Sequence, residues 1–138
     1  MRQYAEGVTM SVNPAPPFVL VVEDDQGCSE LITEVVTELG YQVVVRDNAE
    51  EAQTLLREQR PLLVVLDIML PDADGFSVLR TMRENPDTET TPVMLCTAAL
   101  FEVSEFHNPV IDPHTEIMPK PFHIDTFVSV MERLMAGR

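Results

Sequence analysis

Residues 62–76, LLVVLDIMLPDADGF, contain the pattern from which the fold of this chain can be inferred. The run 62–66 is continuously apolar rather than alternating, which is typical of a strand that is buried on both faces. Asp67 ends the run, and Pro71 and Gly75 then indicate a loop before a helical pattern begins, with Gly75 expected to supply unusual backbone freedom. The pattern predicts a strand of a parallel sheet with a carboxylate at its carboxyl end.

Three other apolar runs of the chain also end in polar residues. These residues are Glu23 with Asp24, Thr97 and Lys120. Because the carboxyl ends of parallel strands meet at one edge of a sheet, we expect all of these side chains to lie together there, where open α/β sheets bind ligands. Three carboxylates, a hydroxyl and an amine at one edge indicate a site for a divalent cation and a phosphoryl group.

Hydrophobic periodicity predicts the other elements. Strands are expected at residues 18–22, 42–45, 62–66, 92–96 and 116–118. Helices are expected at residues 28–39, 48–59, 76–83 and 124–135, with a short, proline-interrupted one within 100–114. Gly40 should close the first helix, and Asn48 should cap the second with Glu51 as its capping-box partner. The alternation predicts an α/β fold with a five-stranded parallel sheet and helices on both faces.

Length and charge narrow the classes of function. The 138 residues suit one domain, which we expect over residues 17–138 after an N-terminal tail of residues 1–16. A net charge of −14 argues against a nucleic-acid partner. No apolar run approaches the ~20 residues that span a bilayer, and no signal-peptide pattern is present, so a cytoplasmic location is expected. Cys28 and Cys96 lack metal-ligand spacing and are expected to be reduced thiols.

Four pieces of the chain together match one known family. They are VLVVEDD (19–25), LLVVLDIMLPDADGF (62–76), PVMLCTAA (92–99) and MPKPF (118–122). In this order and spacing they resemble the receiver domain of two-component response regulators, over about residues 17–136. The resemblance implies a doubly wound (βα)5 sandwich with the flavodoxin-like strand order, in agreement with the predicted elements.

The resemblance also implies a metal site built around a phosphoacceptor. Asp67 would be the phosphoacceptor, since a carboxylate can attack a phosphoryl group and form an aspartyl phosphate. Asp24 and Asp67 would bind Mg²⁺ directly, Glu23 would bind it through water, and the backbone carbonyl of Met69 would be a further ligand. Asp25 is interpreted as an acid at a helix N-terminus rather than as a ligand.

Two further residues complete the implied site. Lys120 would pair with Asp67 at rest and with the phosphoryl oxygens afterwards, and the Lys120–Pro121 bond would be cis. The hydroxyl of Thr97 would donate a hydrogen bond to a phosphoryl oxygen. The phosphoryl donor would be a phosphohistidine of a histidine kinase or a histidine phosphotransfer protein. The chain would catalyse only its own phosphorylation and slow autodephosphorylation, and would not be an enzyme acting on other molecules.

Some residues depart from the family pattern. Ile117 stands where the family usually has Tyr or Phe, so we expect an output that does not use an aromatic switch. It would work through a remodelled segment 100–114 or by passing the phosphoryl group onward. Met69 and Ala99 cannot position a water strongly, which predicts slow to moderate self-hydrolysis. We expect no output domain after residue 138, and therefore a single-domain regulator. It would be a monomer or weak dimer that signals by contact with an unknown protein target.

Other functions are open to the same sequence. A phosphorylation-independent interaction module on a receiver fold is favoured by Ile117 but opposed by the complete polar set. A phosphatase with an aspartate nucleophile usually has a second Asp two residues after the nucleophile, where this chain has Met69. A flavin-binding flavodoxin is disfavoured because the loop 23–27 is acidic and cannot cradle a phosphate.

Overall fold

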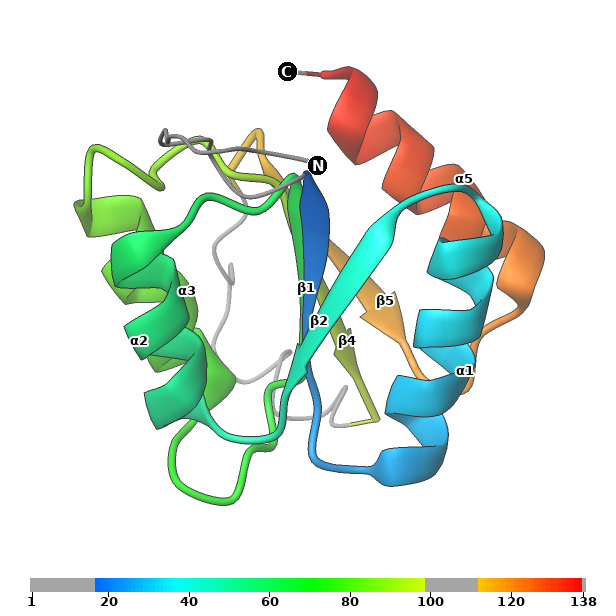
Figure 1. Cartoon of the computed structure of the whole chain (residues 1–138), viewed down its shortest axis with the longest axis horizontal. Helices are drawn as coiled ribbons and strands as arrows, with labels where there is room; N and C mark the ends of the chain where they lie inside the picture. Colours follow the sequence, from blue (N-terminus) through cyan, green and yellow to red (C-terminus); the bar gives the residue numbers. More distant parts are fainter. Residues whose placement is uncertain (1–16, 99–111, 138) are drawn as a thin grey trace, which may run out of the picture.

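The structure, a computed structural model, describes residues 17–98 and 112–137, in which helices lie on both sides of a central parallel sheet (Figure 1). The strands are β1 (Phe18–Val22), β2 (Gln42–Arg46), β3 (Leu63–Leu66), β4 (Val93–Thr97) and β5 (Thr115–Pro119). The helices are α1 (Gln26–Glu38), α2 (Ala49–Glu58), α3 (Gly75–Glu84) and α5 (Ile124–Ala136). The helix expected within 100–114 falls mostly on residues 99–111, which lie outside the described part of the chain.

The strand order β2-β1-β3-β4-β5 confirms the predicted doubly wound topology. Val22 of β1 pairs with Leu66 of β3, so that the next residues, Glu23 and Asp67, leave the sheet side by side. Thr97, the last residue of β4, is paired with Pro119, the last residue of β5, directly before Lys120. The register therefore brings the polar strand ends to one edge, as the sequence predicted.

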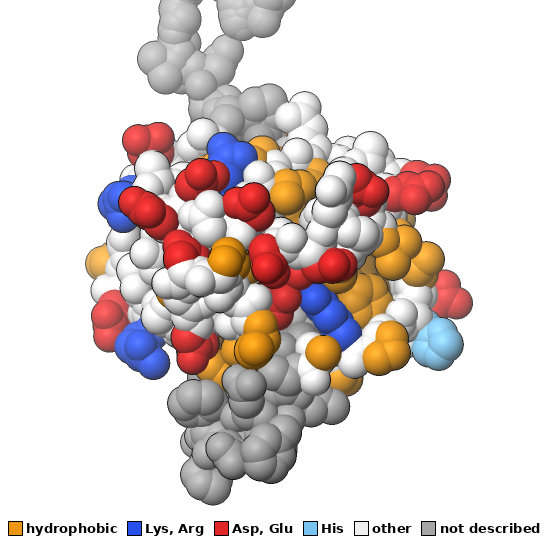
Figure 2. All heavy atoms as spheres, turned by 90° about the horizontal axis from the view of Figure 1, so that it is seen from below, with side chains coloured by type: hydrophobic (Ala, Val, Ile, Leu, Met, Phe, Trp, Pro, Cys, Tyr) orange, Lys and Arg blue, Asp and Glu red, His pale blue; other side chains and the backbone are white. Residues whose placement is uncertain are grey.

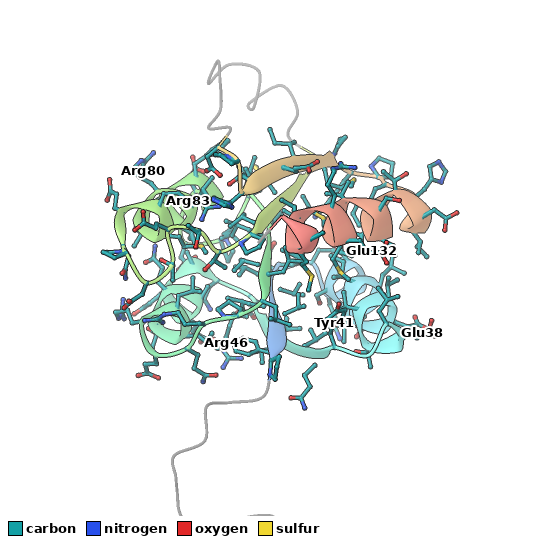
Figure 3. All side chains as sticks on the ribbon, turned by 90° about the horizontal axis from the view of Figure 1, so that it is seen from above. Glu38, Tyr41, Arg46, Arg80, Arg83 and Glu132 are labelled. Carbon is teal, nitrogen blue, oxygen red and sulfur yellow. The ribbon has the colours of Figure 1, made fainter. Side chains whose placement is uncertain are left out.

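Two apolar cores lie on the two faces of the sheet. Figure 3 shows the sheet with α2 and α3 on one side and α1 and α5 on the other. Every residue of β1 is buried, and alternate residues contribute to opposite cores. Leu20 and Leu79 lie in the core beneath α2 and α3, whereas Val21, Phe127 and Met131 lie in the core beneath α1 and α5. Each such side chain stabilises the fold by about 1.5–3 kcal/mol, which explains why the strands lack polar residues until they end.

The first helix begins and ends with specific caps. Asp25 is its N-cap, and the Asp25 carboxylate accepts a hydrogen bond of 2.8 Å from the backbone N–H of Cys28. Gly40 has a φ of 99°, and the N–H groups of Gly40 and Tyr41 donate to the carbonyls of Thr37 and Val36. This is a Schellman motif, and it confirms that Gly40 closes the helix.

The second helix is capped from two directions. Asn48 accepts a hydrogen bond from the N–H of Glu51 at 2.8 Å, as predicted for the N-cap. Asp72, which lies in the loop after β3, also accepts hydrogen bonds from the N–H groups of Ala49 and Glu50, at 2.7 and 3.0 Å. The loop that follows Asp67 is therefore tied to the start of α2.

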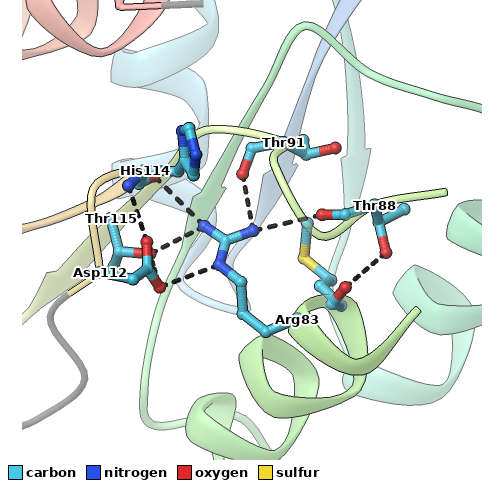
Figure 4. Close-up of polar contacts among 7 residues, drawn as sticks. Arg83, Thr88, Thr91, Asp112, His114 and Thr115 are labelled. Atoms are coloured by element: carbon cyan, nitrogen blue, oxygen red, sulfur yellow. Dashed lines mark hydrogen bonds and ion pairs between the residues drawn. The ribbon is translucent and has the colours of Figure 1, made fainter. Parts of the chain in front are cut away.

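Arg83 is the centre of a polar network at the amino edge of the sheet (Figure 4). Its guanidinium donates to the Asp112 carboxylate at 2.9 Å and to the Thr115 hydroxyl at 2.8 Å. It also donates to three backbone carbonyls, those of Thr88, Thr91 and His114. This one side chain links the end of α3 to the segments that enter β4 and β5.

Candidate functional site

Three carboxylates meet at the carboxyl edge of the sheet. Glu23, Asp24 and Asp67 each place one oxygen within 4.8 Å of the others. Glu23 and Asp67 are only 3% and 6% exposed, whereas Asp24 faces solvent. Figure 2 views this edge and shows acidic side chains gathered around a basic one. Hard, closely spaced oxygen donors of this kind are the ligands that Mg²⁺ prefers.

Lys120 is the basic group of this cluster. Its Nζ lies 3.2 Å from Oδ2 of Asp67, so the expected contact between these residues is present. The shorter contact, at 2.6 Å, joins Nζ to Oε1 of Glu23, and the sequence did not predict it. Burial would lower the pKa of Lys120, but the hydrogen bond to Glu23 and the two carboxylate charges outweigh it and hold this pKa above its ordinary value. The Lys120–Pro121 peptide bond is cis, as expected.

Glu23 has both carboxylate oxygens engaged. Oε1 accepts from Lys120, and Oε2 accepts from the backbone N–H of Asp25 at 3.2 Å. Burial raises the pKa of Glu23, and the neighbouring Asp67 adds to the increase, although the two hydrogen bonds to Lys120 and Asp25 oppose it. Glu23 is thus a nearly buried carboxylate that depends on Lys120 for charge compensation.

Asp67 is held by its own loop. Its Oδ1 accepts from the N–H of Met69 at 3.0 Å, and its backbone N–H donates to the carbonyl of Val22 at 3.0 Å. The backbone of Met69 therefore lies beside the acidic cluster, and its side chain is 54% exposed. These contacts leave the Oδ2 side of Asp67 facing Lys120.

Position 75 requires glycine for a different reason from the one predicted. The expectation of unusual backbone freedom is wrong, because among the described glycines only Gly40 has a positive φ. Instead, a Cβ at Gly75 would lie 2.2 Å from the carbonyl oxygen of Asp67 and 2.8 Å from Cα of Ile68. The N–H of Gly75 donates to the carbonyl of Ile68 at 2.7 Å. The absence of a side chain lets α3 begin directly against the backbone of Asp67.

The charges of the cluster are not balanced. Three carboxylates, those of Glu23, Asp24 and Asp67, face one ammonium group, so the formal charge is −3 + 1 = −2. A divalent cation would neutralise this excess, and the donor set fits Mg²⁺. Asp25 lies outside the cluster because its carboxylate caps α1, as expected from the sequence.

The structure describes the backbone of Thr97 only. Its backbone ends β4 at the same edge as Lys120, but its side chain is outside what the structure describes. The hydrogen bond expected from its hydroxyl stays a prediction. Ile117 is half-buried and packs against the core beneath α2 and α3.

Neither cysteine shows the features of a reactive thiol. Cys28 and Cys96 are free, as expected. Burial raises the pKa of Cys28 to about 11, with a further contribution from the charge of Glu23. Burial also raises the pKa of Cys96, which is 1% exposed. Thiols are unreactive when their pKa is raised in this way.

The fold and the acidic edge define a doubly wound α/β domain with three carboxylates at the carboxyl edge of its sheet. The model of the response regulator receiver domain family matches residues 19–132. The chain belongs to this family. Among residues 17–98 and 112–137, none of the helices has the length and apolar character needed to cross a membrane.

Known proteins similar to this chain include larger regulators. A transcriptional regulatory protein of Streptomyces coelicolor, AfsQ1, is 42% identical over 82 residues, which cover 59% of this chain and 35% of AfsQ1. The response regulator MprA of Mycolicibacterium vanbaalenii is 32% identical over 120 residues, which cover 87% of this chain and 51% of MprA. The matches thus span about a third and about half of these two regulators.

A solved structure with a bound ligand is also similar. The response regulator TrrA of Thermotoga maritima, crystallised in complex with Mg²⁺-BeF, aligns with a TM-score of 0.72 and 26% identity. The alignment covers 86% of this chain and 98% of TrrA. The similarity therefore extends over nearly the whole receiver domain.

Proposed function

We propose that residues 17–138 are a receiver domain that accepts a phosphoryl group on Asp67 within a two-component phosphorelay. The observation that carries the proposal is a nearly buried Asp67 carboxylate with an ammonium 3.2 Å away and two more carboxylates beside it. The donor is a phosphohistidine of a histidine kinase or a histidine phosphotransfer protein. The bond between phosphorus and Asp67 forms as the N–P bond of the phosphohistidine breaks. The imidazole leaves with the electron pair and takes up a proton.

The residues around Asp67 divide this work. The N–H of Met69 fixes Oδ1, which leaves Oδ2 as the attacking atom. The ammonium of Lys120 stabilises negative charge on the phosphoryl oxygens, and the Thr97 hydroxyl donates to one of them. Asp24, Asp67 and the Met69 carbonyl would hold Mg²⁺ directly, with Glu23 acting through water. Mg²⁺, when bound, would neutralise the charge that the phosphoryl group brings, and the Mg²⁺-BeF complex of TrrA supports this choice of metal.

The surroundings of the site favour a protein as the phosphoryl donor and slow to moderate hydrolysis of the phosphorylated aspartate. A hollow of about 380 Å³ beside Lys120, lined also by Cys28, Leu31 and Phe122, gives a donor group access to the edge. The exposed side chain of Met69 has no strong hydrogen-bonding group for water, which favours slow to moderate self-hydrolysis. We expect the chain to act in the cytoplasm and to signal by contact with a protein target.

A second function is favoured by one observation. Ile117 is aliphatic and packs against the core beneath α2 and α3, so the movement of an aromatic ring at this position is not available. A receiver fold without that ring could serve as a phosphorylation-independent interaction module. Whether Asp67 can be phosphorylated distinguishes between these two functions.

The test is the intact mass of the protein after incubation with Mg²⁺ and acetyl phosphate, beside Asp67→Asn. Asp47→Asn is the matched control, because Asp47 is an exposed carboxylate that directly follows the edge strand β2 and lies outside the acidic cluster. We expect one phosphoryl adduct on the wild type and on Asp47→Asn, and none on Asp67→Asn. If neither acetyl phosphate nor a phosphorylated phosphotransfer protein labels the wild type, the interaction module becomes the better conclusion.

A further inference from the structure

We propose that the groove between α1 and β2 binds a basic helix of a partner protein other than the phosphoryl donor. The groove is a hollow of about 580 Å³, and β2 is the outermost strand of the sheet, with α1 beside it (Figure 1). None of the residues that line it belongs to the acidic cluster around Asp67. Cys28 and Leu31, which line the hollow beside Lys120, do not line this groove. The inference therefore goes beyond the proposed function and describes a second surface.

Short, uncharged side chains form part of the lining of the groove. Ser29, Thr33 and Thr37 contribute them from α1, and Val45 contributes from β2. Val45 is 37% exposed, whereas its neighbour Val44 packs against a core of the domain. An exposed valine on an edge strand, beside short hydroxyl side chains, leaves room for an apolar side chain of a partner.

Three acidic side chains line the same groove along α1. They are Glu30, Glu34 and Glu38, and all three are exposed. They follow one another at intervals of four residues, so with a rise of about 1.5 Å per residue they are about 6 Å apart along the helix axis. Basic residues at the same interval on a partner helix have the same spacing. The groove therefore complements a helix with Lys or Arg at every fourth position.

The charges of these three glutamates are not compensated within the part of the chain that the structure describes. The ion pairs found there involve other carboxylates. Helix α1 contains no Lys or Arg, whereas α2, α3 and α5 each contain at least one Arg. Like charges four residues apart destabilise a helix, and Glu38 stands in the last turn, where the helix dipole disfavours a carboxylate. A basic partner would remove both unfavourable effects.

A hollow beside α2 provides a comparison within the same domain. Three glutamates also line it, namely Glu50, Glu51 and Glu58. Arg46 lies among the lining residues, and α2 itself contains Arg57. Because this hollow already includes a cation of the chain, we expect it to bind a basic helix more weakly than the groove beside α1 does.

Titration of the ¹⁵N-labelled full chain with synthetic peptides, followed by NMR, tests the proposal. The probe is an alanine-based peptide of about 20 residues, long enough to form a helix in water, with Lys at every fourth position and one Leu beside that row. The control peptide has the same composition, but its Lys residues are distributed around the helix. We expect the first peptide to bind on the order of tenfold more tightly and to shift the resonances of residues 29–38 and Val45.

Two triple variants locate the binding. In Glu30→Gln/Glu34→Gln/Glu38→Gln, the affinity for the first peptide should fall on the order of tenfold or more. The control replaces the three glutamates of the hollow beside α2 by glutamine, which removes the same charge, and should change the affinity by less than about twofold. The variant in α1 should unfold at the same temperature as the wild type or higher, because repulsion between like charges is removed.

Several outcomes would overturn the proposal. Absence of binding, no preference between the two peptides, or equal effects of the two triple variants would leave only a general attraction to an acidic protein. If the same resonances shifted on concentrating the protein without peptide, the occupant would be a second copy of the chain. If deletion of residues 1–16 shifted them, that segment would be the occupant. The phosphoryl adduct on Asp67 is measured separately, so none of these outcomes affects the proposed function.

Discussion

The two edges of the sheet each surround one basic side chain, but they do so in opposite ways. At the amino edge, Arg83 donates five hydrogen bonds, and only one of its partners, Asp112, is charged. At the carboxyl edge, Lys120 contacts two carboxylates, those of Glu23 and Asp67, in a cluster with an excess of negative charge. The first basic group is fully satisfied by the fold, whereas the second leaves charge to be compensated from outside.

This difference separates a structural network from a site of chemistry. A planar guanidinium with all its donors engaged fixes the geometry of the segments around it. A compact ammonium among surplus carboxylates can change partners when a cation or a phosphoryl group arrives. The comparison therefore predicts that substitutions at the amino edge reduce stability, and that substitutions at the carboxyl edge reduce phosphorylation.

The largest expected effect is that of Arg83→Met. The substitution leaves Asp112 without its cation and removes the donor from the Thr88, Thr91 and His114 carbonyls. We expect the free energy of unfolding to fall by about 2–4 kcal/mol, because partly buried acceptors lose their partners. Urea denaturation followed by circular dichroism measures this loss. The folded fraction should still be phosphorylated by acetyl phosphate.

Lys120→Met is the matched substitution at the other edge. It should reduce the rate of phosphorylation on the order of a hundredfold, while the protein remains folded in the presence of Mg²⁺. The proposed difference between the two edges would be contradicted if Lys120→Met unfolded the protein or if Arg83→Met abolished phosphorylation of folded molecules.

The next effect concerns Gly75→Ala. The added Cβ would meet the Asp67 carbonyl oxygen at 2.2 Å, so that the backbone must shift. We expect a loss of about 2 kcal/mol in stability and slower phosphorylation, since the same shift moves Asp67. Gly27→Ala is the control: its Cβ finds the nearest atom at 3.7 Å, and alanine should stabilise α1 by up to about 1 kcal/mol. Thermal unfolding and acetyl phosphate labelling of both variants test the difference.

The carboxyl edge could be predicted from the sequence, whereas the amino edge could not. Asp67 and Lys120 each follow an apolar run, and the rule that parallel strands end together places them at one edge. Arg83 gives no such signal, because it sits in the last turn of a helix, where a basic residue is ordinary. Its partners Asp112 and Thr115 are about 30 residues further along the chain. Only the folded arrangement brings them to it.

Two close contacts at the site also could not be predicted from the sequence. The resemblance implied that Lys120 would pair with Asp67, but the closer contact to Glu23 depends on side-chain reach across two strands. A glycine in a loop suggests backbone freedom, whereas the need for Gly75 comes from the close approach of α3 to the Asp67 backbone. Sequence patterns report which residues end an element, and they do not report how closely two elements approach.

A smaller effect is expected for Asp112→Asn, whose cost in stability should depend on pH. Partial burial would raise the pKa of Asp112, but Arg83 and the N–H of His114 outweigh it and hold this pKa below its usual value. A carboxylate whose pKa is lower in the folded state contributes stability above its unfolded pKa of about 3.9, and this stability is lost as the pH falls through the folded value. The difference in unfolding free energy between wild type and Asp112→Asn should be on the order of 1 kcal/mol at pH 7. It should shrink below about pH 4. A difference that stays constant down to pH 2 would contradict the ion pair with Arg83.

The smallest expected effect is that of Asp72→Ala, which tests whether the loop after Asp67 supports the start of α2. The N–H groups of Ala49 and Glu50 donate to Asp72 and hold its pKa below the usual value, so the carboxylate accepts both bonds at neutral pH. Without Asp72, amide hydrogen exchange at Ala49 and Glu50 should become faster, because two first-turn donors lose their acceptor.

Asp47→Ala is the control for that substitution, since Asp47 contacts only the side-chain amide of Asn48 among its described hydrogen-bond partners. It should leave exchange at both amides unchanged. Phosphorylation of Asp72→Ala should proceed at nearly the wild-type rate, because Asp67 keeps its hydrogen bond from Met69 and its contact with Lys120. Strongly slowed phosphorylation would instead show that the tie to α2 holds Asp67 in place. The structural support of this edge would then extend beyond Gly75 to a helix that contributes no side chain to the acidic cluster.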